Sequence, residues 1–209
     1  MNPYKTLLLV GPTGSGKTPL GDLLQEKGLW DKRCVHFDFG ANLRKIAETP
    51  AGSSFFTKGE IDIITHSLSS GVLLENENFH IAEKILVLFA EEKNIGRDDL
   101  LILNGLPRHV GQARNIDSIV DINMLVYLEG TVKVIQERLH QNSGGDRTDR
   151  TDDSVQAIAK KLRIFHERTI PLLDYYESKN VKIEKIQISV DTAPDDIVNH
   201  LNATSCPFV

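Results

Sequence analysis

The chain has 209 residues, of which 40% are hydrophobic and 25% are charged, a balance typical of a folded globular protein rather than a disordered one. Its formal net charge of -5 gives no support for a nucleic-acid or anionic-membrane partner. No segment approaches the roughly 20 apolar residues that a membrane-spanning helix needs. The two cysteines, Cys34 and Cys206, cannot build a disulfide framework and show no metal-ligand spacing. We therefore expect reduced thiols in a cytoplasmic protein.

Apolar runs and segments of helical periodicity alternate along the chain. The predicted strands are almost continuously apolar except for the last, as expected of a parallel sheet covered on both faces. They are Thr6–Val10, Cys34–Asp38, Leu100–Asn104, Ile122–Leu128 and Val181–Ile188. The predicted helices are Lys17–Glu26, Ala41–Glu48, Glu60–Ser69, Asn78–Glu92, Val132–His140, Asp152–Ser178 and Ala193–Leu201. This alternation predicts a doubly wound α/β fold with a parallel sheet, helices on both faces and ligands at the carboxyl ends of the strands.

Two segments interrupt the alternation. Residues 39–70 hold two helical patterns with no strand between them, which predicts a helical insertion. Residues 140–153, "HQNSGGDRTDRTDD", are polar and contain glycines, which predicts a loop between two helices. Both segments should project from the end of the sheet that carries the first strand-to-helix connection.

That first connection is "GPTGSGKT", residues 11–18, which fits the pattern G-x-x-x-x-G-K-[ST] between a strand and a helix. Its glycines allow backbone N–H groups to surround an anion at a helix amino terminus, where the helix dipole also favours negative charge. Lys17 can reach the outer phosphates of a nucleotide, and the Thr18 hydroxyl can ligate magnesium. The sequence therefore predicts a P-loop that binds ATP through Gly11, Thr13, Gly14, Ser15, Gly16, Lys17 and Thr18.

Several arginines occur where the predicted fold could bring them around one cleft. They are Arg44, Arg108, Arg138, Arg147 and Arg150. Phosphoryl transfer spreads negative charge over equatorial oxygens, and guanidinium groups bind phosphate in a bidentate manner. One group near the insertion and another in the polar loop are what a two-substrate phosphotransferase needs.

The motifs together carry a family resemblance. The stretches "GPTGSGKT", "GANLR", "SSGVLL", "NGLPRHVGQA", "ERL", "DRTDD" and "ERTIPLLDYYESK" occur in the order seen in adenylate kinases and related nucleoside monophosphate kinases. The chain resembles these enzymes over residues 5 to roughly 190. The resemblance implies a five-stranded P-loop core (1–38, 71–140 and 152–209), a monophosphate-binding helical lobe (39–70) and a short lid (141–151) with no zinc.

The resemblance also implies roles for individual residues. Arg44 and Arg108 match arginines that bind the acceptor phosphate, and the backbone of Leu74 and the side chain of Gln112 match groups that contact the acceptor base. The full set implied for the monophosphate is Phe39, Gly40, Arg44, Leu74, Gly105, Arg108 and Gln112. Arg138 matches an arginine that packs on ATP. The catalytic set implied is Lys17, Arg108, Arg138 and Arg150, with Arg147, Arg150 and Asp152 in the lid.

The chain departs from the family at several of these positions. Asn104 stands where the family has the aspartate that holds the water shell of magnesium, so Asn104 would contact those waters only weakly. Phe39 replaces a threonine that contacts adenine, and Ala41 replaces an aspartate. Asn142 and Lys161 stand where arginines are usual. Because the strand ends at Asn104, an aspartate placed there would be expected to bind magnesium–ATP more tightly and raise turnover.

The sequence thus predicts an enzyme that transfers the γ-phosphate of Mg-ATP to a nucleoside monophosphate, with AMP as the best-supported acceptor. Its partners would be ATP and that monophosphate, with magnesium as cofactor, and no nucleic acid, membrane or second copy of the chain. Two alternatives stay open. One is a nucleotide-binding sensor or scaffold with little turnover, and the other is a P-loop kinase acting on another small metabolite.

Overall fold

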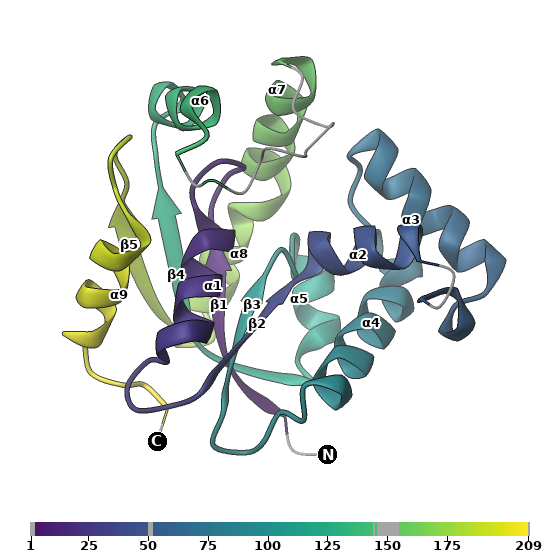
Figure 1. Cartoon of the computed structure of the whole chain (residues 1–209), viewed down its shortest axis with the longest axis horizontal. Coiled ribbons are helices and arrows are strands. Elements are labelled where there is room, and N and C mark those ends of the chain that lie inside the picture. Colours follow the sequence, from purple (N-terminus) through teal and green to yellow (C-terminus); the bar gives the residue numbers. More distant parts are fainter. Residues whose placement is uncertain (1–2, 50–51, 144, 146–154, 209) are drawn as a thin grey trace.

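The structure is a computed structural model that describes residues 3–49, 52–143, 145 and 155–208. Five parallel strands form one sheet in the order β2-β3-β1-β4-β5, with helices on both sides (Figure 1). The strands are β1 (Tyr4–Val10), β2 (Cys34–Asp38), β3 (Leu100–Asn104), β4 (Val120–Glu129) and β5 (Lys182–Gln187). The predicted five-stranded parallel sheet is therefore confirmed, and each strand bound lies within two residues of its expected place.

Alternating side chains of each strand divide the core between the two faces of the sheet. On β1, Leu8 and Val10 pack in one apolar cluster, whereas Leu7 and Leu9 pack in a second. The helices α4 (Phe79–Glu92), α5 (Val110–Ile116) and α8 (Pro171–Glu177) supply the first cluster, and α1 (Lys17–Lys27) and α9 (Pro194–Asn202) supply the second. Because both faces are covered, the strands need apolar residues at nearly every position, which explains their sequence pattern.

The insertion predicted at residues 39–70 contains α2 (Phe39–Glu48), a short 3-10 turn (Gly52–Phe55) and α3 (Lys58–Ser70). Within the described residues of this segment there is no strand. The helix α3 begins at a capping box, in which Thr57 accepts from Glu60 N and Glu60 accepts from Thr57 N, and ends at Gly71 with φ 66°. Figure 1 shows α2 and α3 extending to one side of the sheet, beyond the end of β2.

The long helix predicted at residues 152–178 is interrupted. The structure has α7 (Val155–Ile164), one π-helical turn (Phe165–Thr169) and α8, and residues 152–154 lie outside the described part of the chain. Ile170 N donates to Phe165 O, five residues back, at 3.0 Å. Pro171 has no amide hydrogen for the regular helical ladder, so a widened turn before it is a natural outcome.

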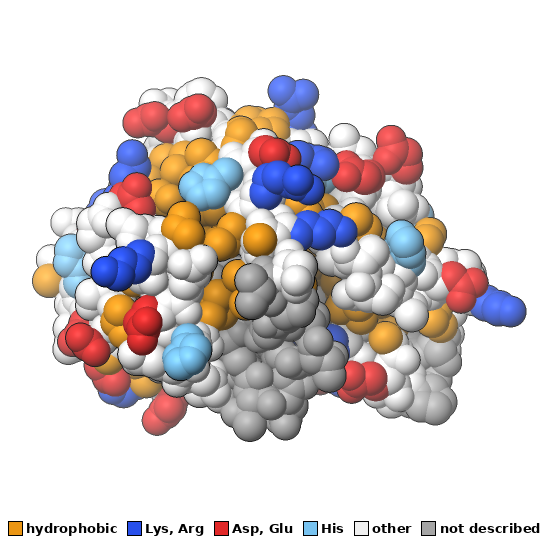
Figure 2. Space-filling view, turned by 90° about the horizontal axis from the view of Figure 1, so that it is seen from above, with side chains coloured by type: hydrophobic (Ala, Val, Ile, Leu, Met, Phe, Trp, Pro, Cys, Tyr) orange, Lys and Arg blue, Asp and Glu red, His pale blue; other side chains and the backbone are white. Residues whose placement is uncertain are grey.

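The remaining described elements are α6 (Val132–Gln141) and a short 3-10 turn (Asn76–Asn78) that precedes α4. The sequence did not predict α5, because it has only seven residues and starts at a histidine: His109 accepts from Gln112 N at 3.4 Å. Every helix in the described ranges is too short or too polar to traverse a bilayer. Figure 2 shows acidic and basic side chains interspersed over the described part of the face seen from above.

Candidate active site

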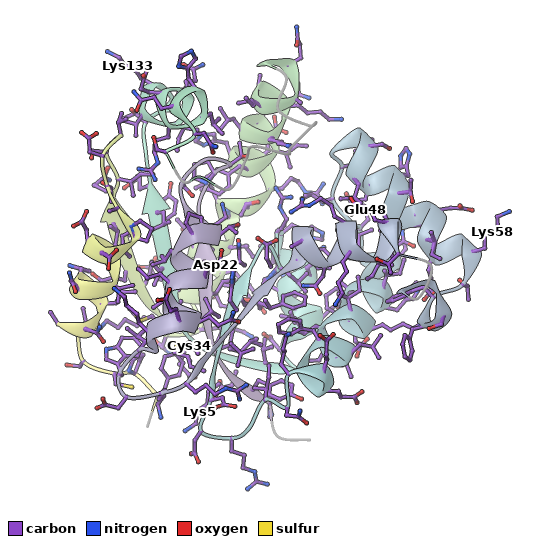
Figure 3. All side chains as sticks on the ribbon, viewed as in Figure 1. Lys5, Asp22, Cys34, Glu48, Lys58 and Lys133 are labelled. Carbon is purple, nitrogen blue, oxygen red and sulfur yellow. The ribbon has the colours of Figure 1, made fainter. Side chains whose placement is uncertain are left out.

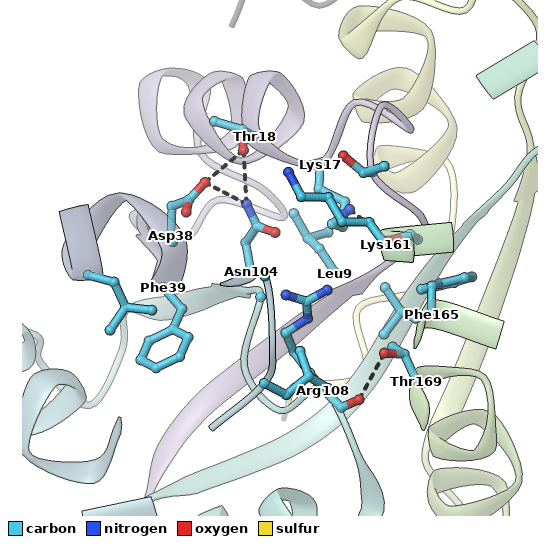
Figure 4. A pocket seen from close by; sticks show the side chains of 18 of the residues that line it. Leu9, Lys17, Thr18, Asp38, Phe39, Asn104, Arg108, Lys161, Phe165 and Thr169 are labelled. Atoms are coloured by element: carbon cyan, nitrogen blue, oxygen red, sulfur yellow. Dashed lines mark hydrogen bonds between the residues drawn. The ribbon is translucent and has the colours of Figure 1, made fainter. Parts of the chain in front are cut away.

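One cavity lies at the carboxyl ends of β1, β2 and β3, where a parallel sheet ordinarily binds its ligands (Figure 4). Its walls come from the glycine loop, the start of α2, the end of α3 and the segment that follows β3. The π-helical turn closes another side through Phe165 and Thr169. Segments far apart in the sequence therefore meet around a single space.

Most of the predicted site residues line this cavity. They are Gly11, Thr13, Gly14, Gly16, Lys17, Thr18, Phe39, Gly40, Arg44, Leu74, Asn104, Gly105, Arg108 and Gln112. Ser15 is buried within the glycine loop, and Arg138 is buried behind it, so neither is among the lining residues. Arg147, Arg150 and Asp152 lie outside the described residues.

The glycine loop has the backbone that the motif predicts. Gly14 and Gly16 have φ values of 81° and 96°, which residues with a Cβ rarely adopt. At Gly11 a Cβ would lie 2.5 Å from Ser15 Oγ and 3.0 Å from Leu128 O, so only glycine fits there. Lys17 Nζ donates to Gly11 O at 2.7 Å and to Pro12 O at 2.9 Å. The ammonium group therefore lies over the loop, at the place where a bound phosphate would approach.

A carboxylate that sequence reasoning did not assign to the site faces the first turn of α1. Asp38, the last residue of β2, accepts a hydrogen bond from Thr18 Oγ1 at its Oδ2 atom, at 2.7 Å. Asn104 Nδ2 donates to the same Oδ2 atom at 3.0 Å and to Thr18 Oγ1 at 3.2 Å (Figure 4). The available signal was a charged residue that ends an apolar strand, which also describes an ordinary helix cap.

Asp38 does serve as the N-cap of α2, because its Oδ1 atom accepts from Ala41 N at 2.8 Å. Burial alone would raise the pKa of Asp38, but the hydrogen bonds from Thr18 and Ala41 and the nearby His36 and Arg44 more than offset it, so the pKa is lowered. The side chain is thus a carboxylate at neutral pH, with both oxygens held by donors.

Arg108 brings positive charge to the opposite wall. Its side chain points into the cavity (Figure 4), and desolvation by burial lowers the pKa of its guanidinium. Its backbone is fixed on both sides, since Arg108 N donates to Gln112 Oε1 at 2.7 Å and Thr169 Oγ1 donates to Arg108 O at 2.8 Å. Among the described residues the guanidinium has no carboxylate or hydrogen-bond partner. An unpaired, partly buried cation in a cavity is suited to bind an anion.

The residues expected to contact an acceptor base bind one another in this structure. Gln112, only 1% exposed, accepts from Arg108 N and donates from Nε2 to Leu74 O at 2.8 Å. The ring of His109 also lies against this carbonyl, with Nε2 3.2 Å from Leu74 O. Reading a base with Gln112 or Leu74 would therefore require part of this network to open.

Arg138 lies on α6, and its guanidinium is enclosed by backbone carbonyls. Its Nε atom donates to Gly14 O at 3.2 Å, and one terminal nitrogen lies 2.8 to 3.0 Å from Ser189 O, Val190 O and Thr192 O. The residue is 5% exposed. In this position Arg138 joins the glycine loop to the segment after β5.

We therefore expect Arg138→Met to lower the free energy of unfolding by about 3 kcal/mol, since charge-assisted hydrogen bonds contribute about 1.5–3 kcal/mol each and several carbonyls would lose their donor. Denaturant unfolding measures the change. Lys133→Met on the same helix is the control, because Lys133 is exposed and extends into solvent (Figure 3). Unchanged stability together with weakened ATP binding would instead place Arg138 on the nucleotide.

Comparisons with known proteins agree with a P-loop kinase. No family model matches the chain. An adenylate kinase of Xanthomonas campestris pv. campestris is 27% identical over 181 residues, covering 83% of this chain and 86% of the relative. An adenylate kinase of Prochlorococcus marinus is 29% identical over 191 residues, covering 90% of this chain and 92% of the relative.

A similar structure is that of a gluconokinase from Sinorhizobium meliloti, with a TM-score of 0.52 and 16% identity. The likeness covers 95% of this chain and 90% of that one, and at this identity it shows the fold alone. The sequence relatives and the fold together support a phosphotransferase of the P-loop kinase type.

Proposed function

We propose that this P-loop kinase transfers the γ-phosphoryl group of Mg-ATP to a nucleoside monophosphate, with AMP as acceptor, so that ATP and AMP give two ADP. The observation that carries the proposal is the guanidinium of Arg108, which has no partner among the described residues and faces the glycine loop's lysine across one cavity. A phosphate donor and a phosphate acceptor both carry negative charge, so a cavity with cations on two walls suits the pair.

ATP would occupy the glycine loop. The left-handed glycines and the amino terminus of α1 orient N–H groups toward its phosphates, and Lys17 would exchange its loop carbonyls for phosphate oxygens. Thr18 and Asp38 offer oxygen atoms beside that site, and oxygen ligands are the type that magnesium prefers. When bound, magnesium would neutralise charge on the β- and γ-phosphates.

The monophosphate would bind on the side of α2 and α3, with its phosphate on Arg108 and Arg44. Both residues line the cavity, and Arg44 is half-buried on the first helix of the 39–70 segment. In this proposal that segment is the acceptor lobe, whereas Arg147 and Arg150 of the lid that the resemblance implies lie outside the described residues. Lys161, which also lines the cavity, would add charge from α7.

The second candidate is a kinase that phosphorylates a hydroxyl group of a small metabolite, a class suggested by the name of the gluconokinase that shares this fold. A hydroxyl acceptor must lose a proton, which calls for a general base within hydrogen-bond reach. Of the described residues that line the cavity, Asp38 alone is a carboxylate, and its oxygens are held by Thr18, Asn104 and Ala41. A phosphate acceptor needs no such base, so the site favours the monophosphate.

A coupled assay with ATP and a panel of AMP, CMP, UMP, GMP, dAMP and gluconate tests the proposal. We expect turnover with AMP above the other acceptors and none with gluconate. Turnover with gluconate alone would establish the second candidate. Tight binding of ATP and AMP in calorimetry without turnover would indicate a nucleotide-binding sensor or scaffold instead.

A further inference from the structure

Asp38 places a carboxylate beside the hydroxyl of Thr18, at a position where the family resemblance implies none. In the family that the chain resembles, the aspartate that holds the water shell of magnesium stands at the end of β3. This chain has Asn104 there. The neighbouring strand β2 ends in Asp38, and Asp38 is paired with Asn104 in the register of the two strands. The two side chains therefore emerge at the same edge of the sheet.

The carboxylate reaches the metal side of the glycine loop although β2 is not the direct neighbour of β1. β3 lies between them, and Asn104 is paired with Leu9 of β1. Asp38 Oδ2 nevertheless lies 2.7 Å from Thr18 Oγ1, the hydroxyl that the loop motif offers to magnesium. A water molecule bound to an ion at Thr18 would be within reach of that carboxylate.

Asn104 presents donors rather than an acceptor on this side. The residue is 3% exposed, and its Nδ2 atom donates to Thr18 Oγ1 and Asp38 Oδ2. The same nitrogen lies 3.4 Å from His36 Nε2, and His36 Nδ1 lies 2.8 Å from Asp22 Oδ1. These contacts fix which way the amide faces, with its hydrogens toward the carboxylate.

We propose that Asp38 supplies the carboxylate that accepts hydrogen bonds from the water shell of ATP-bound magnesium, and that Asn104 is a positioning residue that holds Asp38 beside Thr18. The inference rests on the proposed binding of Mg-ATP at the glycine loop, but not on the identity of the acceptor.

This inference reverses the expectation drawn from the sequence for Asn104→Asp. An aspartate at position 104 would place a second carboxylate about where Nδ2 now lies, 3.0 Å from Asp38 Oδ2. Like charges at that distance repel, and Asp38 would lose a donor. Asn104→Asp should therefore lower the melting temperature of the ligand-free protein and should not improve the binding of Mg-ATP.

The experiment compares the parent protein with its variants in two measurements. Calorimetry gives the affinity for ATP with and without Mg²⁺, and EPR gives the spectrum of protein-bound Mn²⁺–ATP. Asp38→Asn is the principal variant, because asparagine is as good an N-cap as aspartate and preserves the start of α2 while removing the charge. We expect it to reduce the magnesium enhancement of ATP affinity by about tenfold, the ratio between a charged and a neutral hydrogen bond. It should also alter the Mn²⁺ spectrum, which a purely structural role would not do.

Asp121→Asn is the matched control, since Asp121 is exposed at the opposite end of the sheet and makes the same change of charge. It should leave the magnesium enhancement and the spectrum unchanged. The inference is overturned if Asp38→Asn binds Mg-ATP like the parent protein, or if Asn104→Asp increases the magnesium enhancement without loss of stability. If no nucleoside monophosphate is phosphorylated but Asp38→Asn still loses the magnesium effect, the proposed acceptor is wrong and the role of Asp38 stands.

Discussion

Lys17→Met is expected to lower kcat for phosphoryl transfer by at least about a hundredfold, the usual cost of removing one charged group that stabilises the transferring phosphate. Methionine keeps the length and the apolar stem of the side chain but removes the ammonium, which now lies 2.7 Å from Gly11 O and 2.9 Å from Pro12 O. Steady-state kinetics with saturating ATP and AMP measures the effect.

The stability of Lys17→Met should remain close to that of the parent protein, because the hydrogen bonds of the ammonium to Gly11 O, Pro12 O and Ser15 Oγ all lie within the glycine loop. Lys27→Met on the same helix is the control. Lys27 is exposed and pairs with Asp195, and such surface pairs contribute little. Full activity of Lys17→Met, with ATP affinity intact, would show that the glycine loop takes no part in the reaction.

Arg108→Met is expected to weaken acceptor binding and to raise the stability of the protein. The variant should bind the acceptor at least about tenfold more weakly, because a charge-assisted contact to phosphate contributes about 1.5–3 kcal/mol. Its free energy of unfolding should rise by about 1 kcal/mol, since the guanidinium is desolvated and has no partner among the described residues. Calorimetry with AMP and denaturant unfolding measure the two effects.

ATP affinity of Arg108→Met should change little if the acceptor subsite is assigned correctly. Arg114→Ala is the control on α5, where Arg114 is exposed and six residues further along the chain. Loss of ATP affinity with AMP binding unchanged would exchange the two subsites. A large loss of stability would show that Arg108 contributes to packing rather than to anion binding.

The sequence by itself determined the strands of the sheet and the backbone of the glycine loop. The strands were predictable because a sheet buried on both faces requires continuous apolar runs, as in Leu100–Asn104. The glycine loop was predictable because Gly14 and Gly16 have φ values of 81° and 96°, a local backbone conformation that favours glycine. Both signals lie within a few consecutive residues.

Some elements were not predictable because their signals are weak or local rules compete. The helix α5 has too few residues to show a period, and its start at His109 resembles a loop. The change from α7 to a π-helical turn depends on Pro171, which sequence reasoning left inside one long helix. That turn matters to the site, since it directs Thr169 toward the carbonyl of Arg108.

Only the tertiary structure decided what each charged side chain faces. The sequence around Arg138 predicts an arginine on a helix surface. In the fold, its guanidinium is surrounded by backbone carbonyls of residues more than 50 positions later in the chain. Asp38 reads as a helix cap, and its contact with Thr18 follows from the strand order β2-β3-β1, which no local pattern encodes. Hydrophobic periodicity specifies which residues are buried in a strand, whereas the partners of a polar group depend on which strands become neighbours, and that is settled by packing across the whole sheet.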